Sequence, residues 1–516
     1  KGALSGTGFT RTYTPTTNYV GADSFTYMVF DGTSHSNLAT VTITVQATTI
    51  YLSATGNDGT GTANDSTLPF LTAQAAADFA SSLAPTEDTP VTIEVGAGNF
   101  GNMSFSFDFG ANINWKGAGA GVSVIGDVTT NGTDGAAGTA TGDPELGDYD
   151  GAPGTNAFAL TINSDLTVTF GNISARGGNG GAHAIDNVTY AAYPGDPGIG
   201  GALDLKGHFG TISAMGGDGH GGGAGGSVRL RTGSTSLGID ASGGLDLCTT
   251  ATFCGTDQVS GNGGDIQIDG TTVVTGNIVS KGGENLGNAL GDLYVAGNGG
   301  SIDIFGTVTG TLYAIGGDTY DAQAGAGGSV DIKSTGVVSG DIYVLNGTTV
   351  NAVTTTAEPN YAGTVEISGS VQDIYAHAID NFGGGGSEIV VRGTVRDIYA
   401  YTNVLSCDIA GAGKVLAYIP AVIQNIYAYG GDRNCETAAQ VNIFGMITGT
   451  VSVDGGDSAT TDAPGAAGFV RLNNGSNVNV ISAIGGSAAA GTFNNGGTGG
   501  IVEIYPGSIY DLLNID

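Results

Sequence analysis

Four carboxylates crowd one short, glycine-flanked segment, GDPELGDYDG, and form the clearest candidate for metal chemistry in this chain. They are Asp143, Glu145, Asp148 and Asp150. Calcium takes roughly six to eight oxygen ligands and favours carboxylates, so this segment is a candidate Ca²⁺ site and Ca²⁺ is the one cofactor expected. The spacing differs from that of an EF-hand loop, and a solvated acidic loop is the alternative interpretation.

Four cysteines could form two disulfides. Cys248 and Cys254 flank TTATF and could close a small loop. Cys407 and Cys435 are 28 residues apart, the same spacing as between Ile398 and Ile426 in two copies of a repeated peptide. Equivalent positions on neighbouring strands lie about 4.8 Å apart, which suits a disulfide. Two disulfides predict an oxidising, extracellular compartment, whereas four free thiols are the alternative.

Five tyrosines recur at one position of a repeated nonapeptide, of which GTLYAIGGD (310–318) is an example. They are Tyr313, Tyr343, Tyr375, Tyr399 and Tyr427. Each follows an aliphatic residue that the period-2 pattern turns inward, so the rings should form an outward stripe with about 4.8 Å per step. The stripe is a candidate binding surface for glycans or another subunit. The alternative is that tyrosine simply suits strands.

The elements that position these residues follow from the repeat itself. Copies of the nonapeptide run from GNISARGGN (171–179) to GSIYDLLNI (507–515), and pieces such as GGSVDI (327–332) precede them. Both pieces carry the alternation of a strand with one buried face. We therefore expect an all-β, right-handed parallel β-helix of about a dozen coils over residues 101–516. Gly-Gly pairs are expected to supply positive-φ corners and close backbone approaches, in loops outside the stack.

Composition limits the function. The chain has 516 residues and 95 glycines, with 47 acidic against 14 basic residues and a formal charge of −33. Such a surface repels phosphate backbones and excludes nucleic-acid binding, but suits a secreted protein that must stay soluble. No apolar run is long enough to cross a bilayer. The chain opens KGALSGTGF without a signal peptide, so we expect either that processing removed the signal or that a longer protein contains this chain.

Residues 49–100 should form the entry to the solenoid. Thr72 to Pro85 has the one convincing helical pattern, rich in Ala and stopped by Pro. A turn at Gly56–Asp58, the pair Pro69–Phe70 and the strand VTIEVGAGNF surround it, and together they resemble the entry segment of pectate-lyase-like β-helix proteins. The resemblance implies that the helix caps the open end of the solenoid, where apolar side chains need cover.

Residues 1–48 have another character, with short alternating segments separated by Pro, Gly and Asn. GALSGTG, Tyr13–Pro15, Phe25, the pair Asp31–Gly32 and the closing VTITV resemble the second half of bacterial cadherin-like, Ig-type repeats. A complete Ig-type sandwich needs about 100 residues, so its first half is missing here. We expect that a longer protein or a neighbouring subunit supplies the missing strands, and favour the former.

The β-helix resemblance raises polysaccharide lyases and hydrolases. A lyase needs Ca²⁺ and an Arg or Lys base; Arg392 and Arg396 are the one close basic pair on consecutive strands, and no paired aspartates of a hydrolase are present. We therefore expect a non-enzymatic, extracellular or cell-surface structural protein that self-associates as a filament, stalk or surface layer. A glycan-binding adhesin that uses the tyrosine stripe is the first alternative, and a polysaccharide lyase is the second.

Overall fold

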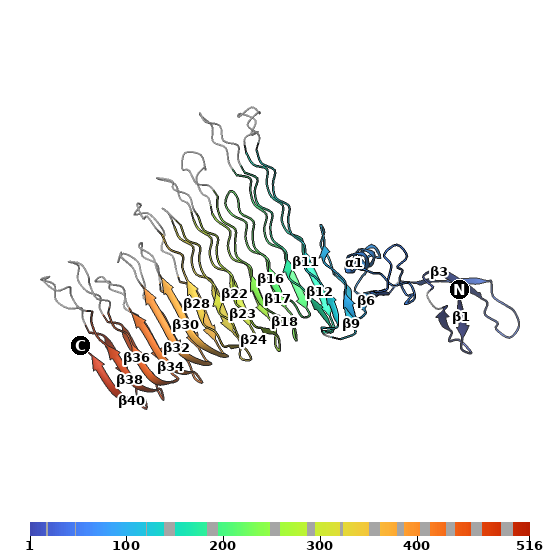
Figure 1. Cartoon of the computed structure of the whole chain (residues 1–516). Helices are drawn as coiled ribbons and strands as arrows, with labels where there is room; N and C mark the ends of the chain where they lie inside the picture. Colours follow the sequence, from blue (N-terminus) through green and yellow to red (C-terminus); the bar gives the residue numbers. More distant parts are fainter. Residues whose placement is uncertain are drawn as a thin grey trace.

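The structure is a computed structural model. It describes residues 1–16, 19–46, 48–119, 121–138, 150–182, 194–247, 259–285, 295–319, 323–349, 362–378, 386–402, 413–429, 439–455, 467–486 and 499–515. Most of the chain is a parallel β-solenoid, with its coils stacked along one axis (Figure 1).

The first strand of each coil belongs to a single 15-stranded parallel sheet that runs through the whole solenoid. Its strands, in order, are β5 (Thr49–Leu52), β6 (Val91–Val95), β9 (Ile113–Gly117), β12 (Leu160–Ser164), β15 (Leu203–Lys206), β17 (Val228–Leu230), β20 (Ile266–Ile268), β23 (Ser301–Ile304), β26 (Ser329–Ile332), β29 (Thr364–Ile367), β31 (Glu388–Val391), β33 (Lys414–Ala417), β35 (Gln440–Ile443), β37 (Phe469–Leu472) and β39 (Ile501–Ile504).

Two columns of short strands face this sheet in the first half of the solenoid. One column contains β7 (Gly98–Asn99), β10 (Ser123–Ile125), β13 (Val168–Phe170), β18 (Thr235–Ser236), β21 (Val273–Val274), β24 (Thr307–Val308) and β27 (Val337–Val338). The other contains β8 (Met103–Ser104), β11 (Val128–Thr129), β14 (Ile173–Ser174), β16 (Thr211–Ser213), β19 (Gly238–Asp240), β22 (Ile278–Val279), β25 (Leu312–Tyr313) and β28 (Ile342–Leu345).

Further along, the two columns merge into one longer strand per coil, because β30 pairs with both β27 and β28. The merged strands are β30 (Ser370–Ala378), β32 (Thr394–Thr402), β34 (Val422–Tyr429), β36 (Met446–Ser452), β38 (Asn477–Ala483) and β40 (Ile509–Ile515). The all-β fold and the parallel solenoid are thus as predicted, and the handedness stays a prediction.

Aliphatic side chains fill the space between the facing columns. In one coil Ile302, Ile304, Val308, Leu312 and Ala314 are all fully buried. The same positions recur in neighbouring coils, because strands pair in register: Ile302 lies opposite Val330, and Leu312 opposite Ile342. Each coil therefore buries its apolar face mainly by stacking on its neighbours, as in other repeat architectures.

The predicted capping helix is present. Helix α1 (Ala73–Ser82) begins after Thr72, whose side chain accepts a hydrogen bond from the amide of Ala75. Its alanine face, which includes the fully buried Ala73 and Ala77, packs at the end of the solenoid that carries β5, β6 and β8. Asp58 fixes the helix start by accepting hydrogen bonds from the amides of Leu71 and Thr72 at 2.7 and 3.0 Å.

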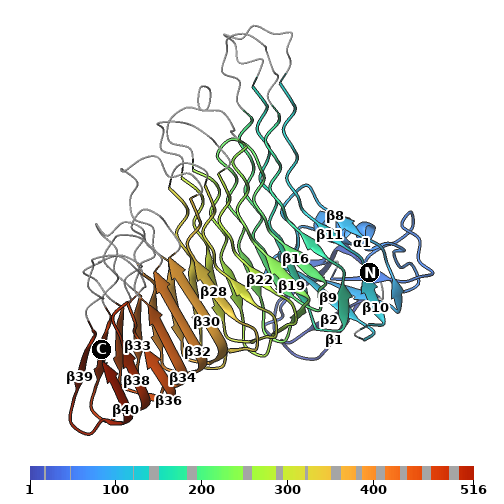
Figure 2. The ribbon, with the colours of Figure 1, turned by 60° about the vertical axis from the view of Figure 1, so that its left-hand side comes forward.

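The glycine-rich segments differ from expectation. Where they are described, they leave the strands as long, nearly straight pairs of chains that pack side by side (Figures 1 and 2). Gly132 and Gly135 donate to the carbonyls of Arg176 and Asn179 in the next coil, both at 2.8 Å. The two donors are three residues apart, and so are the two acceptors. Three residues is the period of a polyproline-II-type helix. These segments are therefore an ordered layer of the solenoid, which we call the glycine bundle.

Most Gly-Gly pairs of this bundle are needed because the backbone of a neighbouring chain lies too close for a side chain. A Cβ on Gly178 would lie 2.0 Å from the carbonyl oxygen of Thr133, and one on Gly244 would lie 1.8 Å from that of Gly217. The predicted positive-φ corners are absent at Gly178 and Gly244, whereas the adjacent pair Gly221 and Gly222 does have positive φ, at 85° and 60°. The predicted close backbone approach is confirmed.

Residues 1–45 form two small antiparallel sheets, one of β1 (Gly2–Ser5) with β2 (Thr12–Pro15) and the other of β3 (Gly21–Tyr27) with β4 (Ala39–Val45). The hydroxyl of Tyr13 on β2 donates to Asp23 on β3 at 2.8 Å and ties the two sheets together. Apolar side chains such as Met28 and Phe30 remain more than half exposed, at 53% and 56%. Such exposure is typical of a sandwich that lacks part of its cover.

Candidate functional site

The five predicted tyrosines form one stack. Successive strands align Tyr313, Tyr343, Tyr375, Tyr399 and Tyr427 in register. Ring centroids are 5.4, 4.8, 4.8 and 5.1 Å apart, and the ring planes deviate from parallel by 3–13°. We call this stack the tyrosine ladder. Its geometry is as predicted, and its role in binding stays a prediction.

A second aromatic row lies beside the ladder and was not singled out from the sequence. It contains His377, Tyr401 and Tyr429, each two residues after a ladder tyrosine and therefore on the same face of its strand. Tyr401 stacks on Tyr429 at 5.0 Å and contacts His377 edge-on at 4.5 Å. The signal in the sequence was the repeated YAH and YAY. The two rows together make a broad aromatic face on β30, β32 and β34.

Stacking decides which part of each ladder ring is free. Because every inner ring has a parallel ring on both sides at about 5 Å, both of its faces are covered. Only ring edges and hydroxyl groups remain for a partner. A sugar that packs flat on an aromatic ring needs a free face, and the inner tyrosines do not offer one.

A raised pKa keeps the hydroxyls of Tyr343, Tyr375, Tyr399 and Tyr427 protonated at neutral pH. Burial, followed by the charges of Asp373 and Asp341, raises the pKa of Tyr375 to about 12. Burial also raises the pKa of Tyr343 and Tyr399 above the usual value for tyrosine. These hydroxyls are therefore a row of neutral hydrogen-bond donors.

An acidic row flanks the middle of the ladder: Asp341, Asp373 and Asp397 each lie two residues before a ladder tyrosine. Asp373 and Asp397 lie opposite each other on β30 and β32, and Asp373 is nearly buried. Like charges at this spacing repel. Arg396 offsets the repulsion, since its Nε lies 2.8 Å from Asp373 Oδ1 and 3.9 Å from Asp397 Oδ2. On the next coil, the amide nitrogen of Asn425 donates to Asp397 at 2.7 Å.

Both arginines considered for lyase chemistry are thus in ion pairs. Arg396 pairs with Asp373, and Arg392 pairs with Glu366 on the preceding coil. Arg392 also lies over the ring of Tyr418 at 5.2 Å. These contacts give both guanidinium groups a structural role and leave neither as a free base above a carboxylate cluster.

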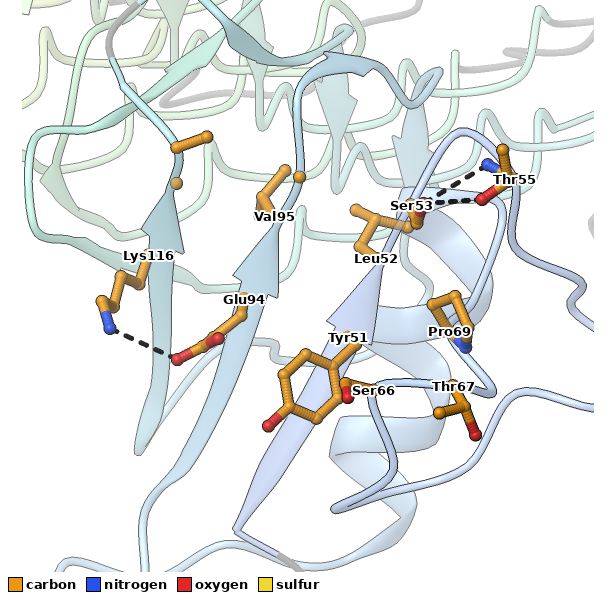
Figure 3. Close-up of a pocket in the computed structure, with 13 residues that line it drawn as sticks. Tyr51, Leu52, Ser53, Thr55, Ser66, Thr67, Pro69, Glu94, Val95 and Lys116 are labelled. Atoms are coloured by element: carbon orange, nitrogen blue, oxygen red, sulfur yellow. Dashed lines mark hydrogen bonds and ion pairs between the residues drawn. The ribbon is translucent and has the colours of Figure 1, made fainter.

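A pocket of about 430 Å³ opens on the outer face of β5, β6 and β9 (Figure 3). Tyr51, Glu94 and Lys116 lie in register across its floor. Glu94 and Lys116 form an ion pair at 3.3 Å. The segment Ser66–Pro69 closes one side. No simple period links these residues, because the coils that carry them differ in length, so the pattern of the sequence does not reveal the pocket.

Other predicted site residues lie outside the described part of the chain. These are Asp143, Glu145 and Asp148 of the acidic segment, and all four cysteines, Cys248, Cys254, Cys407 and Cys435. Asp150 is described and half-buried. The register that suggested the second disulfide is present, since Ile398 lies opposite Ile426. The calcium site and both disulfides stay predictions. In the described ranges, no group of three or more His, Cys, Asp or Glu side chains could hold a metal ion.

Comparison with known proteins identifies the N-terminal unit. Residues 2–44 match the bacterial Ig domain family, in agreement with the resemblance of residues 1–48 to Ig-type repeats. This domain is typical of bacterial surface and extracellular proteins. Neither the curated proteins nor the solved structures contain a match to the chain. A relationship of the solenoid to pectate-lyase-like proteins stays a prediction. Within the described ranges, no helix has the length and apolar character needed to cross a membrane.

Proposed function

We propose that this chain is a rigid extracellular structural element of a bacterial surface protein, acting as a subunit of a filament, stalk or surface layer. The observation that carries the proposal is the continuity of contacts between coils. One sheet of 15 strands and the facing columns join each coil to the next, from β5 to β40, and the glycine bundle adds contacts where its segments are described. A rod of this kind resists bending and local opening, because each coil is held by both neighbours.

Charge placement supports the same proposal. Several basic side chains form ion pairs between adjacent coils, such as Lys414 with Glu388 at 2.8 Å and Arg471 with Glu503 at 2.9 Å. Each exposed pair contributes about 0–1 kcal/mol. Their effect is to place opposite charges directly across neighbouring strands, where like charges would be destabilising. The large remaining negative charge keeps the rod soluble and gives its surface an affinity for cations.

Ca²⁺ is proposed as an assembly ligand at the acidic segment around Asp150, and self-association as the way the rods are used. Electron microscopy of the native chain, with and without a calcium chelator, tests both. Regular fibres or sheets that dissolve on chelation support assembly through Ca²⁺. Isolated rods with no lateral order under either condition contradict the filament proposal, and short flexible particles contradict the rigid rod itself.

The enzyme alternative is tested in parallel. A polysaccharide lyase releases unsaturated sugar ends that absorb ultraviolet light, and this release would be measured on anionic polysaccharides with added Ca²⁺. We expect no release, because Arg392 and Arg396 are neutralised by Glu366 and Asp373. Release that disappears in an Arg396→Ala variant which still folds would establish the lyase.

A further inference from the structure

The pocket at the start of the solenoid contains an aromatic ring, that of Tyr51, on which no other ring stacks in the described part of the chain. Tyr51 has no aromatic neighbour among the described residues, whereas the inner ladder tyrosines are covered on both sides. Its ring lies over the outer face of β5 and borders the open pocket (Figure 3). An aromatic face carries partial negative charge and attracts the C–H groups of a sugar ring.

The polar groups of the pocket suit a ligand without charge. Glu94 and Lys116 cancel each other's charge, although the whole chain carries −33. Their side chains keep 41% and 59% of their surface exposed, so each has hydrogen-bonding capacity free for a ligand. A carboxylate acceptor beside an ammonium donor fits the neighbouring hydroxyl groups of a sugar. The hydroxyls of Ser53 and Thr55 line the same pocket.

The pocket is preformed. Its outer wall is fixed because the amide of Phe70 donates to Tyr51 at 2.8 Å and the amide of Asn57 donates to Pro69 at 2.9 Å. Its upper rim is fixed because Ser123 Oγ donates to the carbonyls of Val95 and Gly96 at 2.9 and 2.8 Å. A site that needs no rearrangement loses less conformational entropy on binding.

We propose that this pocket binds one uncharged sugar ring of a neutral glycan. Tyr51 stacks on the ring, and Glu94 and Lys116 hydrogen-bond its hydroxyl groups. This binding site is separate from the proposed scaffold role: it gives the rod a contact to neutral glycan at the end that carries the Ig-type domain. A shallow pocket for one ring predicts dissociation constants on the order of 1 mM.

Saturation-transfer NMR and calorimetry on the full chain test the proposal. The probes are cellobiose, maltose, lactose and N,N′-diacetylchitobiose, with trigalacturonate as the anionic comparison and the matching neutral polysaccharides as a second arm. We expect binding of at least one neutral disaccharide and weaker binding of trigalacturonate. Signal from the polysaccharide but not from the disaccharide overturns the single-ring pocket, and so does a preference for the anionic sugar.

Four variants locate the binding. Tyr51→Ala should weaken it by about tenfold or more, whereas Tyr51→Phe keeps the ring and should keep the affinity. Lys116→Gln, at an exposed position that tolerates change, should weaken binding several-fold. Tyr313→Ala in the ladder is the matched control and should bind as the parent does. The assignment to this pocket is overturned if a folded Tyr51→Ala chain binds as the parent does, or if Tyr313→Ala loses binding. If Tyr51→Ala does not fold, the affinities of Lys116→Gln and Tyr51→Phe decide the assignment.

Discussion

Asp318 of one coil accepts two hydrogen bonds from Thr348 of the next, at 2.7 Å from the amide nitrogen and 2.8 Å from the hydroxyl. The same contact recurs through the glycine bundle, where Asn179 accepts from the amide of Asp218 at 2.9 Å and Asn298 from that of Ala326 at 2.8 Å. In each case an Asn or Asp side chain reaches forward to a backbone amide of the following coil.

This contact completes the backbone hydrogen bonding of the bundle. Over one three-residue step, Gly177 and Gly178 donate to the carbonyls of Met215 and Thr155, which lie on two different neighbours. The third amide, that of Asn179, has no carbonyl partner and donates instead to the side chain of Asp134 at 2.8 Å. The repeated Gly-Gly-Asn and Gly-Gly-Asp therefore have a physical meaning. Two glycines allow close packing, and the side chain of the third residue accepts a hydrogen bond from an amide of the next coil, as Asn179 does from Asp218.

Replacing the acceptor should loosen the next coil. Asp318→Ala removes two hydrogen bonds of about 1 kcal/mol each and should lower the free energy of unfolding by about 2 kcal/mol. Asp318→Asn keeps the accepting oxygen and loses only the charge, so it is the matched control and should stay close to the parent. Hydrogen exchange would be followed at the Thr348 amide. Faster exchange in Asp318→Ala alone supports the contact, and equal acceleration in both variants assigns the effect to charge.

Close packing makes particular glycines irreplaceable. A Cβ on Gly261 would lie 1.9 Å from the carbonyl oxygen of Gly223, whereas one on Gly270 would have nothing within 4 Å. Gly261→Ala should therefore cost about 1–3 kcal/mol or more, as overpacking does in other buried sites. Gly270→Ala should be neutral or slightly stabilising. Thermal unfolding followed by circular dichroism compares them. If both alanines lowered the unfolding temperature equally, the bundle packing would not be the cause.

Sequence predicted the strands and the tyrosine ladder well, because both depend on a period that is visible along the chain. Alternation places Leu312 inside and Tyr313 outside, and constant alignment of coils then stacks Tyr313 on Tyr343. The ordered glycine bundle was not predicted, because its hydrogen bonds join segments from different coils. A run of glycines has no side-chain pattern that would distinguish a packed chain from a loop.

The pocket around Tyr51 was missed for a related reason. Tyr51, Glu94 and Lys116 belong to the first three coils, whose lengths differ too much for a repeat to align them. His377 and Tyr401 could have been found, since each lies two residues beyond a ladder tyrosine on the same strand. The sequence could not show that the faces of the inner ladder rings are covered, because this depends on the distance between stacked rings.

The ladder itself should contribute to stability. Tyr375 stacks on Tyr343 and on Tyr399, both at 4.8 Å. Tyr375→Ala removes two ring contacts of about 0.5–1.5 kcal/mol each, together with buried area, and should lower the unfolding temperature by several degrees. Tyr375→Phe keeps both contacts and should unfold close to the parent. A Tyr375→Phe chain as unstable as Tyr375→Ala would mean that the hydroxyl, and not the stacking, is the stabilising group.

His377 should make the aromatic face sensitive to acid. Burial among Tyr375, Tyr401 and the neighbouring strands lowers the pKa of His377 to about 4. In the unfolded chain its pKa is near 6.5, so below that value the unfolded state binds a proton that the folded state does not. Stability should therefore be complete above about pH 6.5, fall as the pH drops toward 4, and level off below it.

Carboxylates also titrate near pH 4, so the comparison is made with His377→Phe, which keeps an aromatic ring and cannot be protonated. The unfolding temperature of both chains would be measured between pH 7.5 and about 4. The parent should lose more stability than His377→Phe across this interval, and identical pH profiles would show that His377 titrates alike in both states.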